Sequence, residues 1–425
     1  MTVKLALDEN HGYRVVGPAS VRVESGTLQV LGAEIGEGGS LRIPQHRSYY
    51  LYSMTGRTII SVELGEGARI EAPSPGEEPA RSWVEATDNL LESCDPPCTI
   101  SIVGPVDSGK TSLTALIANR SIVRGLKPAI IDLDIGQADI GPPGFVSLAL
   151  PESWIVWLRE AVPRRMVFAG HVEPGYVTGR VVYGARRLYE EALREGADVI
   201  VVDNDGWVDG WRSLEYRLDL ARAVSANAII VVGSPLLASF FKLRWPGTVL
   251  DLPRPLRVEE RDQALRRALR AENYRRFLEP GVIRELYAED TPVVNACIPL
   301  EGVEEPEHVE KVGGSRILGV SRYPGGACVL LDTAEPPPPE VSREIASKLG
   351  VKEAIVLYTG GMRNILAALT DPEGWDHPAL ILDIDFQKGR ISVKTRYEGP
   401  VAALMVGRLR LDEEYYDLPL RRIWL

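Results

Sequence analysis

One nine-residue segment, residues 104–112, constrains the fold of this chain more than any other part of it. Its sequence, Gly-Pro-Val-Asp-Ser-Gly-Lys-Thr-Ser, fills the phosphate-loop pattern G-x-x-x-x-G-K-[ST] completely. The apolar residues 98–103 before it predict a strand, and residues 113–122 after it predict a helix. Such a loop binds phosphate when a strand delivers it to a helix N-terminus. The context therefore favours binding of a nucleoside triphosphate over a glycine-rich turn that only caps a helix.

The residue types within the loop match the chemistry of a bound triphosphate. Gly104 and Gly109 allow the backbone to curl so that successive N–H groups point at phosphate oxygens. Lys110 can then reach the β- and γ-phosphates, and the Thr111 hydroxyl can ligate Mg²⁺. We therefore predict that the whole loop contacts the nucleotide. Its residues are Gly104, Pro105, Val106, Asp107, Ser108, Gly109, Lys110, Thr111 and Ser112.

The length and the charge of the chain limit its class. With 425 residues it is too long for one ordinary core, which predicts two or three domains. It has no run of about 18 apolar residues and no apolar stretch of a signal peptide at its start, so we expect a cytoplasmic protein without a transmembrane helix. The formal net charge of −11 argues against a surface that coats nucleic acid. Any nucleic acid must then be held by a local basic feature.

The four cysteines are too few and too scattered for a zinc site or a disulfide framework. Cys94 and Cys98 could pair, but the intervening Pro96-Pro97 favours a stiff linker. We therefore expect a buried or inert thiol at each position, Cys297 and Cys328 included.

Hydrophobic patterning predicts three domains and an α/β fold class. Residues 1–92 contain short alternating segments separated by turn residues, which predict a small β-sandwich or barrel. Residues 93–290 alternate apolar runs with helical patterns, which predicts a phosphate-loop NTPase core with a mostly parallel sheet. Residues 291–425 return to β-like patterning and predict a β-rich C-terminal domain. The strands expected in the core are residues 99–103, 129–133, 166–169, 199–202, 228–232 and 248–250.

A phosphate loop needs a carboxylate at the end of a neighbouring strand to organise Mg²⁺ or the attacking group. Two carboxylates, Asp132 and Asp134, end one predicted strand and lie on the same side of an extended segment. The same segment carries Gln137, whose amide can donate and accept near a phosphate. We favour Asp134 as the reactive carboxylate and metal ligand. Asp132 could be structural, and Asp203 alone, at the end of another strand, could serve a plain ATPase.

Two further residues follow predicted strands at the edge where open α/β sheets bind ligands. Trp207, in Asp205-Gly206-Trp207, could stack on a nucleobase or could only cap the end of the sheet. His171 could touch a substrate phosphate or could be a satisfied loop histidine.

A charged helix predicted over residues 257–279 is rich in arginine. Arg266 and Arg267 share one helical face with Arg270, and Arg275 lies a little over one turn further on. Acidic residues nearby offer partners for an ordinary solvated face. An arginine-rich helix after the last strands of a phosphate-loop core also resembles a lid that closes on a transferring phosphoryl group.

Together, these segments resemble the polyribonucleotide 5′-hydroxyl-kinase family, which includes the kinase-like subunit of eukaryotic pre-mRNA cleavage factor. The phosphate loop comes first, and Asp132-Leu-Asp-Ile-Gly-Gln137 resembles the second motif of the family. Asn204-Asp-Gly-Trp207 resembles its Thr-x-Gly-Trp clasp, with asparagine in place of the usual threonine. Arg270 and Arg275 resemble the two arginines of its lid.

The resemblance implies transfer of the ATP γ-phosphoryl group to the 5′-hydroxyl of RNA, with DNA as a second candidate. Lys110 and Mg²⁺ bound to Thr111 would hold the triphosphate, while the N-terminal domain packs over the adenine. Asp134 would orient or deprotonate the 5′-hydroxyl, and Arg270 and Arg275 would neutralise the transferring group. Among the substrate contacts, Gln137 would touch the backbone and Trp207 would clasp a terminal base.

Two other hypotheses stay open at this point. Some members of the family bind ATP without turnover and act as scaffolds in RNA-processing complexes, and a phosphate-loop switch ATPase needs no nucleic acid. The partners expected are ATP, single-stranded or duplex-end RNA or DNA with a 5′-hydroxyl, and RNA-processing proteins, with no membrane.

Overall fold

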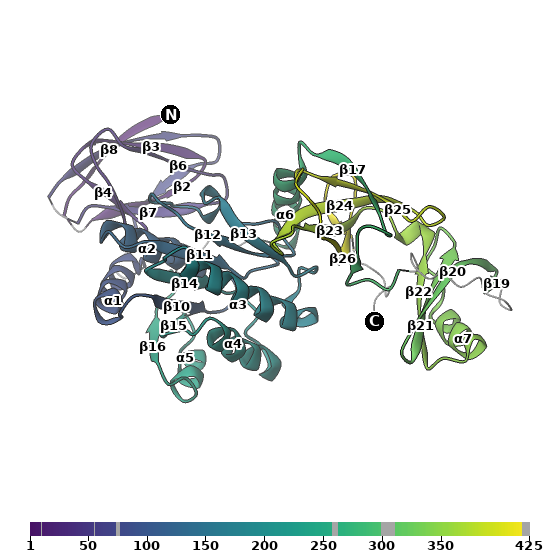
Figure 1. The fold of residues 1–425 in the computed structure, drawn as a ribbon. Helices are drawn as coiled ribbons and strands as arrows, with labels where there is room; N and C mark the ends of the chain where they lie inside the picture. The colour runs from purple at the N-terminus through teal and green to yellow at the C-terminus, as the bar shows by residue number, and fades with distance from the viewer. Residues whose placement is uncertain (10, 55, 74–76, 257–261, 299–310, 419–425) are drawn as a thin grey trace. The chain divides into compact units, whose positions relative to one another are not determined.

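A computed structural model of the chain describes residues 1–9, 11–54, 56–73, 77–256, 262–298 and 311–418 (Figure 1). The chain forms two compact units. The first comprises residues 1–134, 146–164 and 181–262, and the second comprises residues 135–145, 165–180 and 263–425. Because these units alternate along the chain, the domain boundaries proposed at residues 92/93 and 290/291 stay predictions.

The first unit begins with two antiparallel sheets, of strand order β1-β8-β3-β6 and β5-β4-β7-β2-β9. In β3, Val21 and Val23 are buried while the intervening Arg22 is exposed, which is the alternation expected of a half-buried strand. Inward-facing residues of both sheets share one core, so the predicted β-rich region is a sandwich. Its strands are β1 (Thr2–Leu7), β2 (Gly12–Val16), β3 (Ala19–Ser25), β4 (Leu28–Val30), β5 (Ala33–Ile35), β6 (Ser40–Ile43), β7 (Ser48–Tyr52), β8 (Thr58–Leu64) and β9 (Arg69–Glu71).

The phosphate loop belongs to a sheet of strand order β13-β12-β11-β14-β10-β15-β16. Strands β11, β14, β10, β15 and β16 are parallel, and β12 pairs antiparallel with β11. The predicted mostly parallel sheet is therefore confirmed, and β12 is an additional strand that the patterning missed. The bounds are β10 (Cys98–Val103), β11 (Pro128–Asp132), β12 (Phe145–Ala149), β13 (Pro163–Phe168), β14 (Val199–Asp203), β15 (Ala228–Val232) and β16 (Thr248–Leu252).

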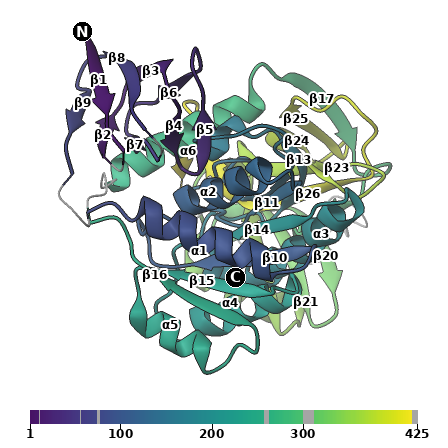
Figure 2. The same cartoon turned by 90° about the vertical axis from the view of Figure 1, so that its left-hand side faces the viewer.

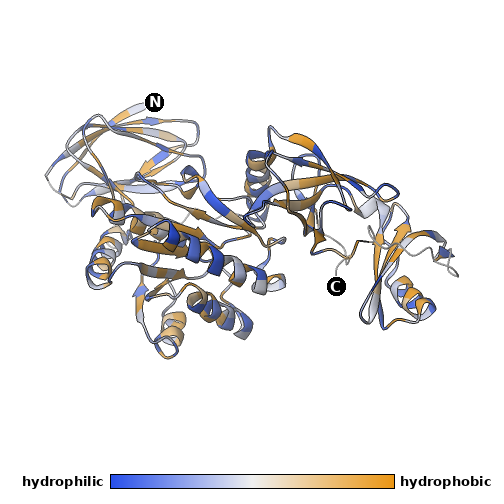
Figure 3. Cartoon of the chain, viewed as in Figure 1, coloured by the Kyte–Doolittle hydropathy of each residue, from blue (hydrophilic) through white to orange (hydrophobic). Residues whose placement is uncertain are grey.

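Helices cover both faces of this sheet, with α1 and α2 on one side and α4 on the other (Figure 2). Apolar residues of α1 and α2, such as Leu91 and Leu116, pack on Ile100 and Ile102 of β10. The strands are accordingly hydrophobic along their length, as parallel strands buried on both faces are (Figure 3). The helices are α1 (Ala80–Ser93), α2 (Lys110–Val123), α3 (Thr178–Arg194), α4 (Trp211–Ala223) and α5 (Pro235–Lys242), with short 3₁₀ turns at Leu158–Glu160 and Pro174–Tyr176.

The second unit contains α6 (Gln263–Leu278), two β-sheets and α7 (Pro339–Leu349). The larger sheet has the order β17-β25-β24-β23-β26-β18 with β27 paired to β26, and the smaller has the order β19-β20-β21-β22. The predicted β-rich C-terminal region is confirmed, and residues 257–261 of the predicted charged helix lie outside the described residues. The strands are β17 (Val282–Tyr287), β18 (Val293–Val294), β19 (Lys311–Val312), β20 (Ser315–Tyr323), β21 (Gly326–Asp332), β22 (Glu353–Tyr358), β23 (Ile365–Thr370), β24 (Asp376–Asp385), β25 (Arg390–Thr395), β26 (Ala403–Leu411) and β27 (Asp417–Leu418).

The cysteines differ from the prediction, because they are paired. Cys94 and Cys98 form one disulfide with Cα atoms 5.7 Å apart, and Cys297 and Cys328 form another with Cα atoms 5.5 Å apart. Cys94 follows α1 directly and Cys98 is the first residue of β10, so the short connection brings the two sulfur atoms together instead of separating them. In the part of the chain that the structure describes, no helix is long and apolar enough to cross a membrane.

Candidate active site

The phosphate loop joins the buried strand β10 to the first residue of α2, as predicted. Asp107 and Gly109 have φ angles of 58° and 97°, in the left-handed region that turns the chain back on itself. A Cβ atom at Gly104 would lie 2.7 Å from both Ser108 Oγ and the Val232 carbonyl oxygen, so only glycine fits there. The loop thus has the tight curl that a phosphate cradle requires.

Lys110 begins α2 and is buried, and its Nζ donates a hydrogen bond to the Pro105 carbonyl oxygen at 2.9 Å. Burial lowers the pKa of Lys110, and the nearby carboxylates of Asp203 and Asp134 oppose that effect. The ammonium group therefore lies in the electrostatic field of Asp134 and Asp203, two of the carboxylates considered from the sequence as partners of the phosphate loop.

The carboxylates lie at the ends of neighbouring strands. Asp132 ends β11 and Asp203 ends β14, and the two are direct partners in the parallel register. Strand β14 lies between β11 and β10, so Asp203 is next to the strand that carries the phosphate loop. Asp132 Oδ1 accepts a hydrogen bond from the Asp134 backbone N–H at 3.1 Å, which fixes the turn bearing the half-buried Asp134. This contact is consistent with the alternative that Asp132 has a structural role and does not take part in the reaction.

A buried ion pair holds the backbone of Trp207. The fully buried Arg217 of α4 pairs with the Asp205 carboxylate, and its Nη2 also donates to the Trp207 carbonyl oxygen at 2.9 Å. Asp205 Oδ1 accepts from the Trp207 N–H at 2.8 Å, so both polar backbone groups of Trp207 are bound. The half-buried indole lies 5.9 Å from the Tyr216 ring, measured between ring centroids. We call Asp205 and Arg217 the clamp.

The loop bearing Trp207 lies directly against the phosphate loop. A Cβ atom at Gly206 would lie 2.9 Å from the Val106 Cα atom, so glycine is needed for this approach. The neighbouring Asn204 is buried, and its amide donates to Ser101 Oγ at 3.0 Å and to the Ile102 carbonyl oxygen at 2.9 Å. Asn204 therefore ties β14 to β10, which accounts for an amide where the family usually has threonine.

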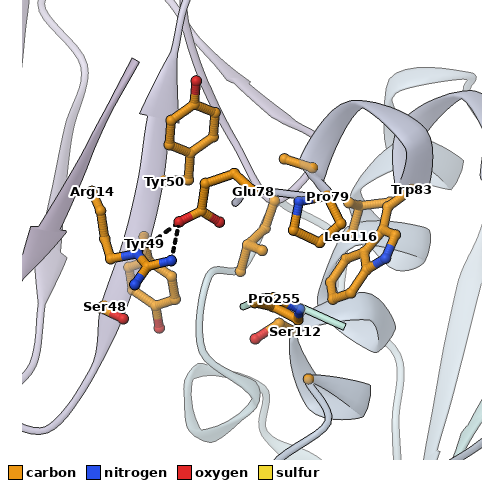
Figure 4. Close-up of a pocket in the computed structure, with 13 residues that line it drawn as sticks. Arg14, Ser48, Tyr49, Tyr50, Glu78, Pro79, Trp83, Ser112, Leu116 and Pro255 are labelled. Carbon is orange, nitrogen blue, oxygen red and sulfur yellow. Dashed lines mark hydrogen bonds and ion pairs between the residues drawn. The ribbon is translucent and has the colours of Figure 1, made fainter. Parts of the chain in front are cut away.

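A cavity of about 120 Å³ opens beside the phosphate loop, between the β-sandwich and α1 and α2 (Figure 4). Trp83 forms part of its wall, held by a hydrogen bond from Nε1 to the Pro253 carbonyl oxygen at 2.9 Å. Arg14 and Glu78 form a buried ion pair at another wall, where burial raises the pKa of Glu78 and Arg14 opposes the rise. The lining residues are Arg14, Leu31, Ser48, Tyr49, Tyr50, Glu78, Pro79, Ala80, Trp83, Gly109, Ser112, Leu116 and Pro255. Aromatic and apolar walls with a few polar groups suit a nucleobase.

The predicted lid arginines belong to the second unit and are held by the C-terminal segment. Arg270 forms an ion pair with Asp417, with its Nε and Nη2 atoms 3.1 and 3.0 Å from Oδ1. Arg275 donates from Nη2 to the Glu414 carbonyl oxygen at 3.3 Å and lies over the Tyr415 ring. The lid prediction is neither confirmed nor contradicted by these contacts.

Helix α6 is also anchored to the segment that follows the second motif. The buried Asn273 donates from Nδ2 to the carbonyl oxygens of Ala138 and Gly141, both at 2.8 Å. Gln137 is half-buried in the same unit and donates to the Gly136 carbonyl oxygen at 2.9 Å. The sequence did not single out Asn273 or the clamp residue Arg217. Arg217 had a local signal, since it falls at helical spacing with the buried Ser213 and Leu220 of α4.

The oxygen donors near the loop fit Mg²⁺. Thr111 is half-buried in the first turn of α2 and Asp134 contributes a carboxylate, both hard ligands that Mg²⁺ prefers. Among the described residues no three His, Cys, Asp or Glu side chains gather as a ready-made metal cluster. Mg²⁺ usually takes only one or two protein carboxylates and completes its shell with phosphates and water, so its binding does not require such a cluster.

Residues 104–280 match the family described as mRNA cleavage and polyadenylation factor CLP1 P-loop. A protein of Thermococcus kodakarensis named polyribonucleotide 5′-hydroxyl-kinase is 31% identical over 344 residues, covering 78% of this chain and 94% of its own length. The chain belongs to the polyribonucleotide 5′-hydroxyl-kinase family. A Pyrococcus horikoshii protein of the same name is 29% identical over 348 residues, covering 78% of this chain and 90% of its own.

A solved structure extends the likeness to the fold. The complex of wild-type Clp1p with Pcf11p (454–563) matches 96% of this chain and 98% of its own with a TM-score of 0.64 at 13% identity. The sequence relatives and the family match confirm the resemblance to the polyribonucleotide 5′-hydroxyl-kinase family inferred from the motifs. The matched P-loop region begins at Gly104 and extends past α6, so it contains the phosphate loop, both carboxylate-bearing strand ends, Trp207 and the arginine helix.

Proposed function

We propose that this protein transfers the γ-phosphoryl group of ATP to the 5′-hydroxyl of RNA, with DNA as a second substrate. The observation that carries the proposal is the environment of Lys110. The buried lysine of the phosphate loop is acted on by the carboxylates of Asp203 and Asp134, and a clamped tryptophan loop lies against the same phosphate loop. A triphosphate, an acceptor and a terminal base thus have candidate partners within one unit.

The nucleotide is bound by the loop and the adjoining cavity. Loop N–H groups and Lys110 hold the β- and γ-phosphates, and the adenine enters the cavity lined by Trp83 and Tyr49. Because Trp83 also lies against Gly109, the cavity is continuous with the loop. Thr111 and Asp134 fit Mg²⁺, which when bound supplies positive charge beside the β- and γ-phosphates.

The acceptor is activated by a carboxylate. Asp134 accepts the proton of the 5′-hydroxyl while that oxygen bonds to the γ-phosphorus and the bond to the β-phosphate oxygen breaks, releasing ADP. Trp207 stacks on the terminal base and Gln137 contacts the substrate backbone. Arg270 and Arg275 exchange their present partners for the transferring phosphoryl group and neutralise its charge.

The test is transfer of label from γ-labelled ATP to single-stranded RNA and DNA oligonucleotides with a 5′-hydroxyl. Labelled oligonucleotide is the expected product. ATP binding without transfer would establish the non-catalytic scaffold instead, and ATP hydrolysis that ignores oligonucleotides would establish a switch ATPase. A cytoplasmic location and an RNA-processing protein as a partner are further parts of the proposal. The solved complex of Clp1p, which has the same fold, with Pcf11p supports such a partner.

A further inference from the structure

Two arginines of the second unit, Arg180 of α3 and Arg408 of β26, contact the loop that follows β13. Arg180 donates from Nη1 to the Ala169 carbonyl oxygen at 3.2 Å, and the Arg408 backbone N–H donates to the Gly170 carbonyl oxygen at 2.7 Å. Gly170 has a φ angle of 82°, and a Cβ atom there would lie 3.0 Å from Arg180 Nη1. Glycine at position 170 therefore leaves room for the Arg180 guanidinium group to lie against the backbone of the loop.

These side chains repel one another. Burial lowers the pKa of Arg180, and the positive charge of Arg408 lowers it further. Burial also lowers the pKa of His171, with Glu173 opposing the shift and Arg408 adding to it. Arg408 therefore acts on both groups, and Arg180 and Arg408 form a cationic cluster beside the His171 imidazole, whose lowered pKa favours its neutral form.

The Glu173 carboxylate acts on His171 but does not pair with either arginine. Within the described part of the chain, neither Arg180 nor Arg408 has a carboxylate partner, and the buried Nε atom of Arg408 has no hydrogen-bond acceptor. By contrast, Arg120 pairs with Asp88 and Arg363 pairs with Asp383. Half-buried guanidinium groups without an anion are unfavourable, and their donor geometry matches a phosphate.

An aromatic pair adjoins the cluster. The His171 ring lies 4.8 Å from the Tyr176 ring, and His171 Nδ1 accepts a hydrogen bond from the Glu173 N–H at 2.9 Å, which fixes the imidazole. The Tyr176 side chain is nevertheless 62% exposed, so one large aromatic surface stays open to solvent. Cationic groups beside an exposed ring are the combination that binds single-stranded nucleic acid, one for the phosphate and the other for a base.

We propose that Arg180 and Arg408 bind a phosphodiester group of the RNA strand and that Tyr176 stacks on an adjacent base. The inference rests on the proposed function, because it takes RNA as the substrate. It assigns to an acidic protein the local basic feature that its net charge of −11 requires, and it identifies a nucleotide contact separate from Trp207. An RNA phosphodiester and free inorganic phosphate share the same anionic chemistry, so the experiment must separate them.

The experiment measures direct binding of a 5′-hydroxyl RNA oligonucleotide, labelled at its 3′ end, by fluorescence anisotropy over a range of salt concentrations. The double variant Arg180→Gln/Arg408→Gln is expected to bind more weakly and to lower the slope of log K against log salt by about 0.7, the value of one phosphate contact in a single strand. Tyr176→Ala is expected to weaken binding roughly 5- to 150-fold with an unchanged slope. The matched control Arg363→Gln removes a paired, exposed arginine of the same unit and should change neither quantity.

The variants also separate binding from folding and one anion from the other. Removal of unpaired cations should leave the melting temperature unchanged or raised, so weaker binding is not a sign of unfolding. Wild-type affinity and slope in the double variant would overturn the inference. If the double variant loses binding of inorganic phosphate but still binds RNA like the wild type, the two arginines bind free phosphate and not the RNA strand. That result would also overturn the inference. Absence of label transfer in the wild type would count against the proposed function alone, because anisotropy does not depend on turnover.

Discussion

Replacing Arg217 with methionine tests whether the buried clamp positions Trp207. The substitution preserves much of the side-chain volume but leaves the Asp205 carboxylate buried without its ion-pair partner and frees the Trp207 carbonyl oxygen. Removing one partner of a buried pair costs about 3–5 kcal/mol. At about 2–4 °C per kcal/mol for a unit of this size, the transition of the first unit should fall by roughly 6–20 °C in differential scanning calorimetry. The KM for oligonucleotide should rise, whereas the KM for ATP should not.

Arg222→Met is the matched control for this experiment. Arg222 lies on the same helix and pairs with Asp219, but both side chains are mostly exposed, so its loss should cost no more than about 1 kcal/mol. A double variant, Asp205→Asn with Arg217→Met, removes the stranded charge and should recover much of the stability without recovering the oligonucleotide KM. If Arg217→Met melts like Arg222→Met, or if the double variant regains normal oligonucleotide binding, the clamp does not position Trp207.

Four other substitutions test the proposed reaction. Lys110→Ala should abolish label transfer with the fold retained by circular dichroism, and turnover at the wild-type rate would exclude the site. Asp134→Asn should keep ATP binding and lose about 10²-fold or more in kcat; an inactive Asp203→Asn beside an active Asp134→Asn would reverse the choice of carboxylate. Trp207→Ala should raise the oligonucleotide KM about 5- to 150-fold and spare that for ATP, since stacking contributes about 1–3 kcal/mol per base; normal oligonucleotide kinetics would reduce Trp207 to a packing residue. Arg275→Ala should chiefly lower kcat in steady-state assays because it acts on charge that develops during transfer, and an effect confined to KM would contradict that role.

The parts of the fold that could be predicted from the sequence are those that depend on local patterns. The phosphate loop lies between its strand and helix as predicted, because glycine positions and flanking hydrophobic residues determine that conformation over a few residues. Strand β12 was missed because Phe145–Ala149 is a short apolar run, which becomes a strand only through its antiparallel pairing with β11. Helix α7 was missed behind a proline-rich start, although Val341 and Ile345 have helical spacing.

The site depends more on contacts between distant residues, which explains what the sequence did not reveal. The cavity beside the loop combines residues as far apart as Arg14 and Pro255, so no single motif contains it. Arg270 meets its carboxylate partner Asp417 across 147 positions of the chain. The cysteine prediction failed for a local reason, since the prolines between Cys94 and Cys98 were treated as a spacer although the chain turns there. Residue types could be predicted from the sequence, but their partners could not.

In the proposed mechanism, Arg270 leaves one anion, the Asp417 carboxylate, and binds another, the phosphoryl group. Arg270 is already largely removed from water and oriented by a carboxylate, so engaging the phosphoryl group requires little further ordering. Only the difference between the two ion pairs then contributes to lowering the barrier. A carboxylate carries one negative charge on two oxygens, whereas a terminal phosphate carries about 1.5 to 2 on three. In the proposed mechanism Asp417 would therefore make Arg270 selective among anions, because a terminal phosphate competes with the carboxylate better than another carboxylate does.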